Sequence, residues 1–367
     1  MRRVRLLITV LVLGMIISFS ACGGKDNDDD IVPPDEIGKI EEPDDNTEDD
    51  SEDEESEEDS HEGMVRSTIT GLYIDENMAK LRPLAIMMGN TKSAAPQSGI
   101  GEASVVYEIP VEGGITRLMS VIEGYKNLKK MGSVRSCRYY FCHYAAEYDA
   151  LYAHVGQSKY AKATLAEKQV LSINGLKGET DAAFFRVSDR KAPHNCYAKG
   201  EEIYKFAEKK GYGVAYPDGH TPHFIFAVDE ENELTNGDTA EYVEPGYSVD
   251  APHFEYNAND KLYYRFQYKD KHVDLETGEQ LTCTNIIIQF VSISYLDDNE
   301  SLKIGTTGSG EGYFITHGKK IAIKWKKDSE FAITHYYDEA DNEIELNPGK
   351  TWILLVNKKN KDKVIIK

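Results

Sequence analysis

The chain has 367 residues, of which 40% are hydrophobic and 29% carry a charge, and its formal net charge is −21. Residues 23–62 hold 21 acidic residues and two lysines, so the 305 residues that follow are only mildly acidic. The acidic balance therefore belongs to one segment and identifies no ligand, and since no basic stripe stands out we expect no nucleic-acid partner.

The first 22 residues have the layout of a bacterial lipoprotein signal peptide. Three arginines precede an apolar run over 6–19, and two small residues lead to Cys22. The run is shorter than the roughly 17–25 residues that a membrane-spanning helix needs, and this order of regions is that of a secretory signal. Residues 19–22 resemble a lipobox, although Phe19 stands where leucine is usual. We predict cleavage before Cys22, lipid modification of this cysteine with acyl chains such as palmitate, and anchoring of the chain on the extracytoplasmic face of the cell membrane. An ordinary secretory signal with an incidental Cys22 is the alternative.

Residues 23–65 are predicted to form a disordered acidic linker. They contain few apolar residues and no phenylalanine, tyrosine or tryptophan. Such a segment cannot bury enough apolar surface to offset the entropy of ordering it, and its like charges extend it. We expect it to separate the folded part from the membrane.

Residues 66–240 are predicted to form an α/β domain, a mixed sheet with helices, because strand and helix patterns alternate there. The expected strands cover 84–88, 104–109, 116–122 and 150–155. The expected helices cover 139–148, 159–167 and 201–210. Gly211 is expected to end the last helix as its C-terminal glycine.

Residues 241–367 are predicted to form a smaller, mainly-β domain. Tyrosine and phenylalanine alternate with polar residues over 261–268, which is typical of a half-buried strand. Further strands are expected at 285–293, 319–325 and 352–356. Pro245 and Gly246 mark the expected hinge between the domains. The glycines of 308–312 are interpreted as a hairpin connection and not a phosphate loop, because no Lys-Ser/Thr follows and the next element is a strand.

Four cysteines follow Cys22, namely Cys137, Cys142, Cys196 and Cys283. Their spacing matches neither a zinc site nor a Cys-x-x-Cys motif, so we predict no metal site. Cys137 and Cys142 are five residues apart in an expected helix, which would put them on different faces. We expect mostly free, buried thiols and leave the disulfide status open.

The polar residues that could bind a ligand lie between positions 112 and 195. Arginines and a serine at an expected helix start are typical of an anion site, and a histidine follows an expected strand where α/β proteins place functional groups. The predicted ligand-binding residues are Glu112, Arg117, Arg135, Ser136, Arg138, His154, Ser158, Arg186, His194 and Asn195. Structural alternatives stay open: a core histidine, a solvated helix cap paired with carboxylates, and a plain turn at Gly113 and Gly114.

Several motifs occur in the order that the YerB-type lipoprotein family shows. They lie at 82–87, 96–100, 106–108, 112–117, 134–138, 148–158 and 190–195, and then at 264–265, 272–274, 285–289, 308–310 and 349–353. The chain resembles this family over roughly residues 78–357. The resemblance implies a two-domain, membrane-anchored bacterial protein, and it supplies no catalytic residue. Cys137 stands where we would expect a small residue such as alanine.

Three hypotheses for function follow. In the first, an Arg/His-lined cleft of the N-terminal domain binds an anionic cell-envelope ligand, a carboxylate or a phosphate. In the second, the chain is a hydrolase of envelope material with His154 or His194 as acid/base. Glu112 would orient that histidine and Ser136 or Ser158 would be the nucleophile, although neither serine has the Gly-x-Ser-x-Gly elbow. In the third, the chain is a scaffold that recruits an envelope protein. None of the three requires a cofactor, and whether the protein is an enzyme stays open.

Overall fold

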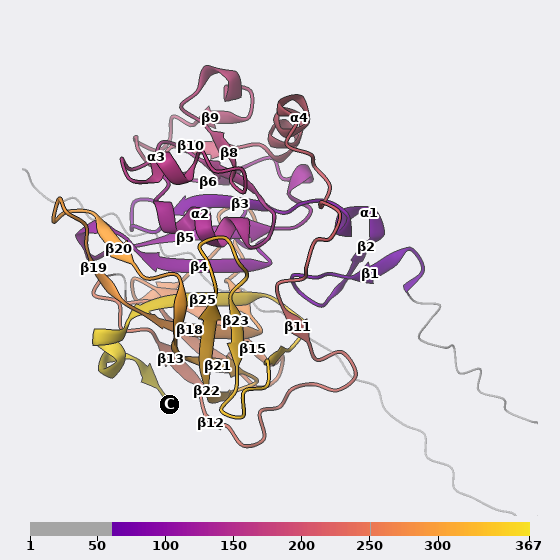
Figure 1. Ribbon diagram of the computed structural model, residues 1–367, viewed down its shortest axis with the longest axis vertical. Helices are drawn as coiled ribbons and strands as arrows, with labels where there is room; N and C mark the ends of the chain where they lie inside the picture. The colour runs from indigo at the N-terminus through magenta and orange to yellow at the C-terminus, as the bar shows by residue number, and fades with distance from the viewer. Residues whose placement is uncertain (1–60, 250) are drawn as a thin grey trace, which may run out of the picture. The chain divides into compact units, whose positions relative to one another are not determined.

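One mixed sheet runs through both halves of the chain (Figure 1). The computed structural model describes residues 61–249 and 251–367, so the predicted signal peptide, Cys22 and most of the predicted linker lie outside the described residues. No helix in the described ranges is long and apolar enough to cross a membrane.

The sheet has eleven strands, and its centre joins sequence-distant segments. The N-terminal half supplies β3 (Leu84–Gly89), β4 (Val105–Pro110), β5 (Thr116–Ile122), β7 (Leu151–His154) and β8 (Leu171–Asn174). The C-terminal half supplies β18 (Asn285–Val291), β21 (Gly308–Thr316), β22 (Lys319–Lys327), β23 (His335–Tyr337) and β25 (Thr351–Asn357), and β12 (Asp238–Thr239) precedes them. The order is β12-β22-β21-β18-β25-β4-β5-β3-β7-β8, with β23 beside β22. β4 and β25 are parallel partners at the junction of the halves, which Figure 1 shows as purple against yellow.

Both faces of this sheet are covered. Along β3, Ala85 and Met87 enter one core, whereas Leu84, Ile86 and Met88 enter the other. Because successive side chains of a strand point to opposite faces, a sheet covered on both sides needs apolar residues at every position, which explains the continuous apolar runs.

The covering elements differ between the two faces. α2 (Tyr139–Ala146) packs its aromatic side chains into the first core. α4 (Gly200–Lys210) packs into the second core, together with a six-stranded sheet of β13 (Tyr242–Glu244), β14 (His253–Asn257), β15 (Leu262–Gln267), β16 (Asp270–Lys271), β17 (Thr282–Cys283) and β26 (Ile365–Ile366).

Shorter elements complete the described chain. The strands are β1 (Met64–Arg66), β2 (Tyr73–Asp75), β6 (Met131–Gly132), β9 (Phe184–Arg186), β10 (Cys196–Ala198), β11 (Ile225–Phe226), β19 (Ile293–Tyr295), β20 (Leu302–Ile304) and β24 (Glu345–Leu346). The helices are α1 (Glu76–Ala79), α3 (Ala161–Thr164), η2 (Glu112–Gly114), η3 (Tyr125–Asn127), η4 (Gly178–Thr180) and η5 (Lys358–Lys363). β6, β10 and β9 form a separate three-stranded sheet next to the candidate site.

The predicted fold class, an α/β N-terminal region with a mixed sheet and a mainly-β C-terminal region, is confirmed. β5 has the predicted bounds, and Gly211 ends α4 at a φ of 73°, with its N–H donating to the carbonyls of Ala207 and Glu208. The predicted helix over 159–167 shrinks to α3, because the N–H groups of Ala166 and Glu167 bond carbonyls three residues back and form turns.

The interpretation of 308–312 as a hairpin connection is wrong, because these residues are the first part of β21. Glycines are needed in this segment because atoms of the neighbouring strands lie very close to it. A Cβ at Gly310 would lie 2.5 Å from Nε1 of Trp325, and one at Gly312 would lie 2.3 Å from the carbonyl oxygen of Ile288. Glycine marks a close approach here and not a turn.

The pairings of short strands cross the predicted domain limits. β1 pairs with β2, so a strand begins at Met64, inside the range predicted for the linker. β11 pairs with β24 and β12 with β22, although both precede residue 241. The limits at 65/66 and 240/241 stay predictions.

Candidate functional site

The candidate site lies where residues 134–138 cross the ends of two strands. The N–H of Arg135 donates to the carbonyl of Met87 at 3.0 Å. The N–H of Val155 donates to the carbonyl of Arg135 at 3.0 Å, and the N–H of Cys137 donates to the carbonyl of Gly156 at 3.0 Å. Since β3 and β7 are parallel, this segment lies at their carboxyl ends. That edge is where open α/β sheets bind their ligands.

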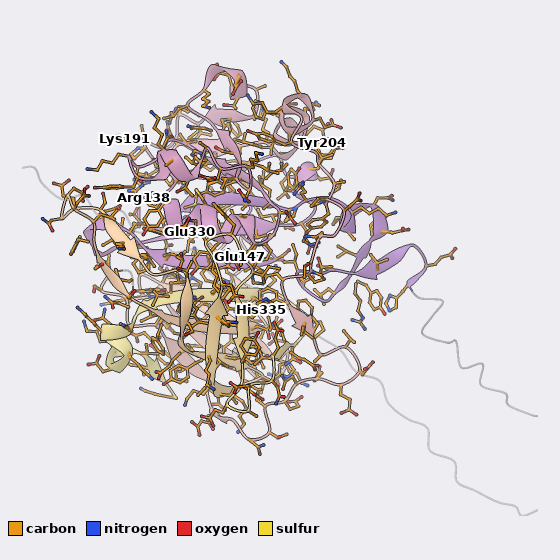
Figure 2. All side chains as sticks on the ribbon, in the orientation of Figure 1. Arg138, Glu147, Lys191, Tyr204, Glu330 and His335 are labelled. Atoms are coloured by element: carbon orange, nitrogen blue, oxygen red, sulfur yellow. The ribbon has the colours of Figure 1, made fainter. Side chains whose placement is uncertain are left out.

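Three arginines meet at this edge. Arg117 comes from β5, is 6% exposed, and donates from Nη1 to the carbonyl of Ser136. Arg138 directly precedes α2 and pairs with Glu112 of η2, with Nη2 and Nε at 2.6 and 2.8 Å from the same carboxylate oxygen. Figure 2 labels Arg138 in the N-terminal half, close to the start of α2. Arg135 is the third member.

The three guanidinium groups repel one another. Burial, and then the charges of Arg138 and Arg135, lower the pKa of Arg117 to about 10. Burial and Arg138 also lower the pKa of Arg135. Burial opposes the charge of Arg138, but the hydrogen bonds and charge of Glu112 outweigh it, so the pKa of Arg138 is raised. Among the residues that the structure describes, one carboxylate thus faces three cations, and two positive charges in this group have no matching carboxylate.

His194 joins the group from the loop between β9 and β10. Nη1 of Arg135 donates to Nδ1 of His194 at 3.3 Å, so Nε2 carries the ring proton and donates to Oγ of Ser93 at 3.1 Å. Burial, followed by the charges of Arg135 and Arg190, lowers the pKa of His194. The ring is therefore neutral at neutral pH and orients Arg135.

Arg190 ties the loop between β9 and β10 to the segment that follows β3. Its two terminal nitrogens donate to the carbonyls of Ala94 and Pro96 at 2.8 and 2.9 Å. Neither Arg190 nor Ser93 was among the predicted ligand-binding residues. Ser93 follows the carboxyl end of β3, and that position was the signal that could have found it.

His154, a predicted ligand-binding and acid/base residue, is not presented at the site. It has no exposed surface; Nδ1 donates to the carbonyl of Gly156 at 2.8 Å and Nε2 accepts from Oγ of Ser172 at 2.9 Å. Burial lowers the pKa of His154 to about 4, although the Gly156 bond opposes this shift. The ring is a neutral link between β7 and β8.

The two serine candidates hydrogen-bond backbone groups. Oγ of Ser136 donates to the carbonyl of Val155 at 3.0 Å, and Oγ of Ser158 accepts from the N–H of Ala161 at 3.3 Å. Within residues 61–249 and 251–367 neither hydroxyl bonds a histidine. The geometry that activates a serine nucleophile is therefore missing from this part of the chain.

Arg186 and Asn195 pair with each other across the β9–β10 hairpin, from Nη1 to Oδ1 at 2.8 Å. The amide of Asn195 also donates to the carbonyl of Val187 at 3.2 Å. The structure thus gathers Glu112, Arg117, Arg135, Ser136, Arg138 and His194, and it leaves His154, Ser158, Arg186 and Asn195 in separate roles.

One group of described side chains has the composition of a metal site. Ligand atoms of Glu231, Glu233 and His317 lie within 4.8 Å of one another. The ammonium group of Lys261 is 3.1 Å from Glu233 and also pairs with Glu231, so a side-chain cation already occupies the space between these carboxylates and offsets one of their two charges. We assign no metal to this group.

Comparison with known proteins relates both halves to one family. Residues 69–213 match the N-terminal domain, and residues 243–353 the C-terminal domain, of the family described as protein of unknown function DUF3048. The curated "Putative lipoprotein YerB" of Bacillus subtilis (strain 168) is 29% identical over 294 residues, which are 80% of this chain and 86% of that protein. A crystal structure of the YerB protein from Bacillus subtilis matches with a TM-score of 0.72 at 27% identity, and covers 83% of this chain and 99% of the crystallised one.

Proposed function

Since the chain belongs to the family of YerB-type lipoproteins with paired DUF3048 domains, we propose that it is a membrane-anchored extracytoplasmic protein that binds an anionic cell-envelope ligand. The ligand offers a phosphate or a carboxylate to the group formed by Arg117, Arg135 and Arg138.

The anchoring part of this proposal rests on the N-terminal sequence and on the relative's name. The basic, apolar and small-residue regions before Cys22 have the order of a secretory signal. Two or three acyl chains on Cys22 hold a protein at a membrane stably, whereas one chain does so only marginally.

The observation that carries the binding part is the unbalanced charge around Arg117. A charge withdrawn from water is costly unless an opposite charge or several hydrogen bonds compensate it. Glu112 is engaged by Arg138, and its pKa is lowered: burial opposes its ionisation, but the hydrogen bonds and charge of Arg138 prevail. Within the described part of the chain, Arg117 and Arg135 are therefore the cations of this group with no matching carboxylate.

The shape of the guanidinium group points to the ligand's chemistry. Its planar fork of N–H donors fits the oxygens of a carboxylate or phosphate with two parallel bonds. His194 and the Ser136 carbonyl hold two of the three forks in place. Less ordering is then left to the moment of binding, which favours affinity.

The test uses inorganic phosphate and acetate as probes at matched ionic strength. Binding is followed by ³¹P NMR for phosphate and by thermal unfolding for both anions. Arg135→Gln should weaken phosphate binding about ten- to a hundredfold, because a hydrogen bond to a charged group contributes roughly 1.5–3 kcal/mol. Arg186→Gln is the matched control, since Arg186 is exposed and its side-chain hydrogen bond among the described residues goes to Asn195.

Equal phosphate affinity of Arg135→Gln and the unmodified protein would reject the site. So would a loss of affinity of the same size in Arg186→Gln, because the effect would then reflect the net charge of the surface.

A further inference from the structure

Two buried sulfurs face each other beneath the arginines. Sγ of Cys137 and Sγ of Cys142 are 3.3 Å apart, and neither residue has any exposed surface. The expectation that these cysteines lie on different faces of one helix is wrong. α2 begins at Tyr139, so Cys137 belongs to the extended segment before it and helical spacing does not apply.

We propose that Cys137 and Cys142 form an intramolecular disulfide in the extracytoplasmic protein. A disulfide joins sulfurs about 2.0 Å apart, so the pair needs an approach of about 1.3 Å. The two other described thiols are buried as well, but among the described residues Cys196 and Cys283 contact no sulfur. Geometry therefore selects one pair.

The step is a thiol–disulfide exchange with a low-molecular-weight disulfide as oxidant. One cysteine thiolate attacks the small disulfide, forms a mixed disulfide and expels a small thiolate. The second cysteine then displaces the other small thiolate and closes the ring. The two cysteine sulfurs are oxidised, the small disulfide is reduced to two thiols, and these take up the two cysteine protons.

Burial governs when this exchange takes place. Burial and the neighbouring Cys137 raise the pKa of the Cys142 thiol, so the folded protein holds little Cys142 thiolate, and neither sulfur is exposed to an oxidant. The exchange therefore occurs while the first turn of α2 is still open, during folding after export. Once closed, the bond is shielded from reductants by the same packing.

The bond would close a short ring around the start of α2. The ring contains Arg138, and the carbonyl of Cys137 accepts from the N–H of Ser158, so the ring also ties to the segment after β7. A closed ring holds Arg138 next to Glu112. The disulfide rests on the extracytoplasmic location in the proposed function but not on anion binding, because the bond itself depends on the two sulfurs alone.

The test maps thiols in the full-length protein extracted from membranes. The protein is denatured in N-ethylmaleimide without reductant, digested and analysed by mass spectrometry. We expect Cys137 and Cys142 in one cross-linked peptide lacking two hydrogens, with Cys196 and Cys283 alkylated. After prior reduction all four should be alkylated.

A second arm refolds the reduced protein in oxidised glutathione. Cys142→Ala should leave Cys137 alkylated or glutathionylated, whereas Cys196→Ala, the matched control, should leave the cross-link intact. Alkylation of both Cys137 and Cys142 in the unreduced protein, repeated after refolding in oxidised glutathione, would overturn the proposal. In the protein with both cysteines, a stable mixed disulfide of Cys137 or Cys142 with glutathione, without a bond between the two, would overturn the proposal too. Both readouts are independent of phosphate binding.

Discussion

Replacement of Arg265 by methionine tests whether the two halves of the fold depend on one buried ion pair. Arg265 lies in β15 and Glu108 in β4, and neither side chain is exposed. Nη2 of Arg265 is 2.8 Å from Oε2 of Glu108, and Nε donates to Nδ1 of His272 at 3.0 Å. The guanidinium also lies 4.1 Å from the ring centre of Trp352.

Arg265→Met should be strongly destabilising because it removes the cation that is paired with the buried carboxylate of Glu108. The carboxylate would keep bonds from Asn90 at 3.1 Å and from Thr116 at 2.8 Å, both of them neutral donors. Breaking a buried pair on one side costs about 3–5 kcal/mol. With an unfolding entropy of roughly 2.1 cal/mol/K per residue over about 300 residues, this corresponds to a fall in Tm of about 5–8 °C.

Urea unfolding followed by circular dichroism and by tryptophan fluorescence gives the free energy of unfolding. The matched variant is Glu108→Gln with Arg265→Met, which removes both charges and should recover at least half of the loss. A cost below about 1 kcal/mol for Arg265→Met would refute the reasoning. No recovery in the double variant would show that packing against Trp352, and not the charge, is responsible.

Three further outcomes are expected from changes elsewhere in the chain. Burial lowers the pKa of both His143 and His154 to about 4. The unfolded chain takes up these protons near pH 6.5, so the folded state binds fewer protons than the unfolded state between about pH 6.5 and 4. The free energy of unfolding should therefore fall by about 3 kcal/mol per histidine as the pH decreases through that window. Urea midpoints measured against pH should show this loss, and His154→Gln should flatten the slope; an unchanged slope would contradict the assignment. Gly200→Ala should lower the free energy of unfolding several times more than Gly211→Ala. A Cβ at Gly200 would lie 1.8 Å from a backbone oxygen, whereas a Cβ at Gly211 would meet nothing within 4 Å and would add only left-handed backbone strain of about 1–2 kcal/mol. Equal denaturation midpoints of the two variants would contradict this. Cys22→Ser should move the protein from the membrane pellet to the soluble fraction, and retention in the pellet would speak against lipid anchoring.

Local pattern was sufficient for two elements of different burial. β5 is buried at every position and was predicted from its largely apolar run, whereas α4 was predicted within one residue because its buried residues recur at helical spacing. The pairing of β4 with β25 could not be predicted from the sequence, since more than 200 residues separate the two strands and nothing in the sequence of either strand specifies a parallel partner. The Glu147–Lys327 pair, fully buried where α2 meets β22, was missed for the same reason; Figure 2 shows Glu147 close to where the two halves of the ribbon meet.

The type of a residue within a motif did not determine whether that residue belongs to the candidate site; its neighbours in the folded chain did. His154 and His194 were given the same roles from the sequence, as ligand-binding residues and as acid/base candidates. Ser172 and the carbonyl of Gly156 satisfy both ring nitrogens of His154, whereas His194 bonds Arg135. These partners come from other segments, so only the fold separates the two.

The charge count at the site also narrows the chemistry of the proposed ligand. A tally of arginines between 112 and 195 could not show that Glu112 engages Arg138 and that no other described carboxylate matches Arg117 and Arg135. Two such cations are balanced more fully by a phosphate monoester, which carries about −1.5 to −2 at neutral pH, than by a single carboxylate. The fork of each guanidinium can then meet different oxygens of one phosphate group, while acetate has oxygens for only one fork. A phosphate monoester should therefore bind more tightly than acetate, and its advantage should shrink as the pH falls below about 6 and the monoester loses its second charge.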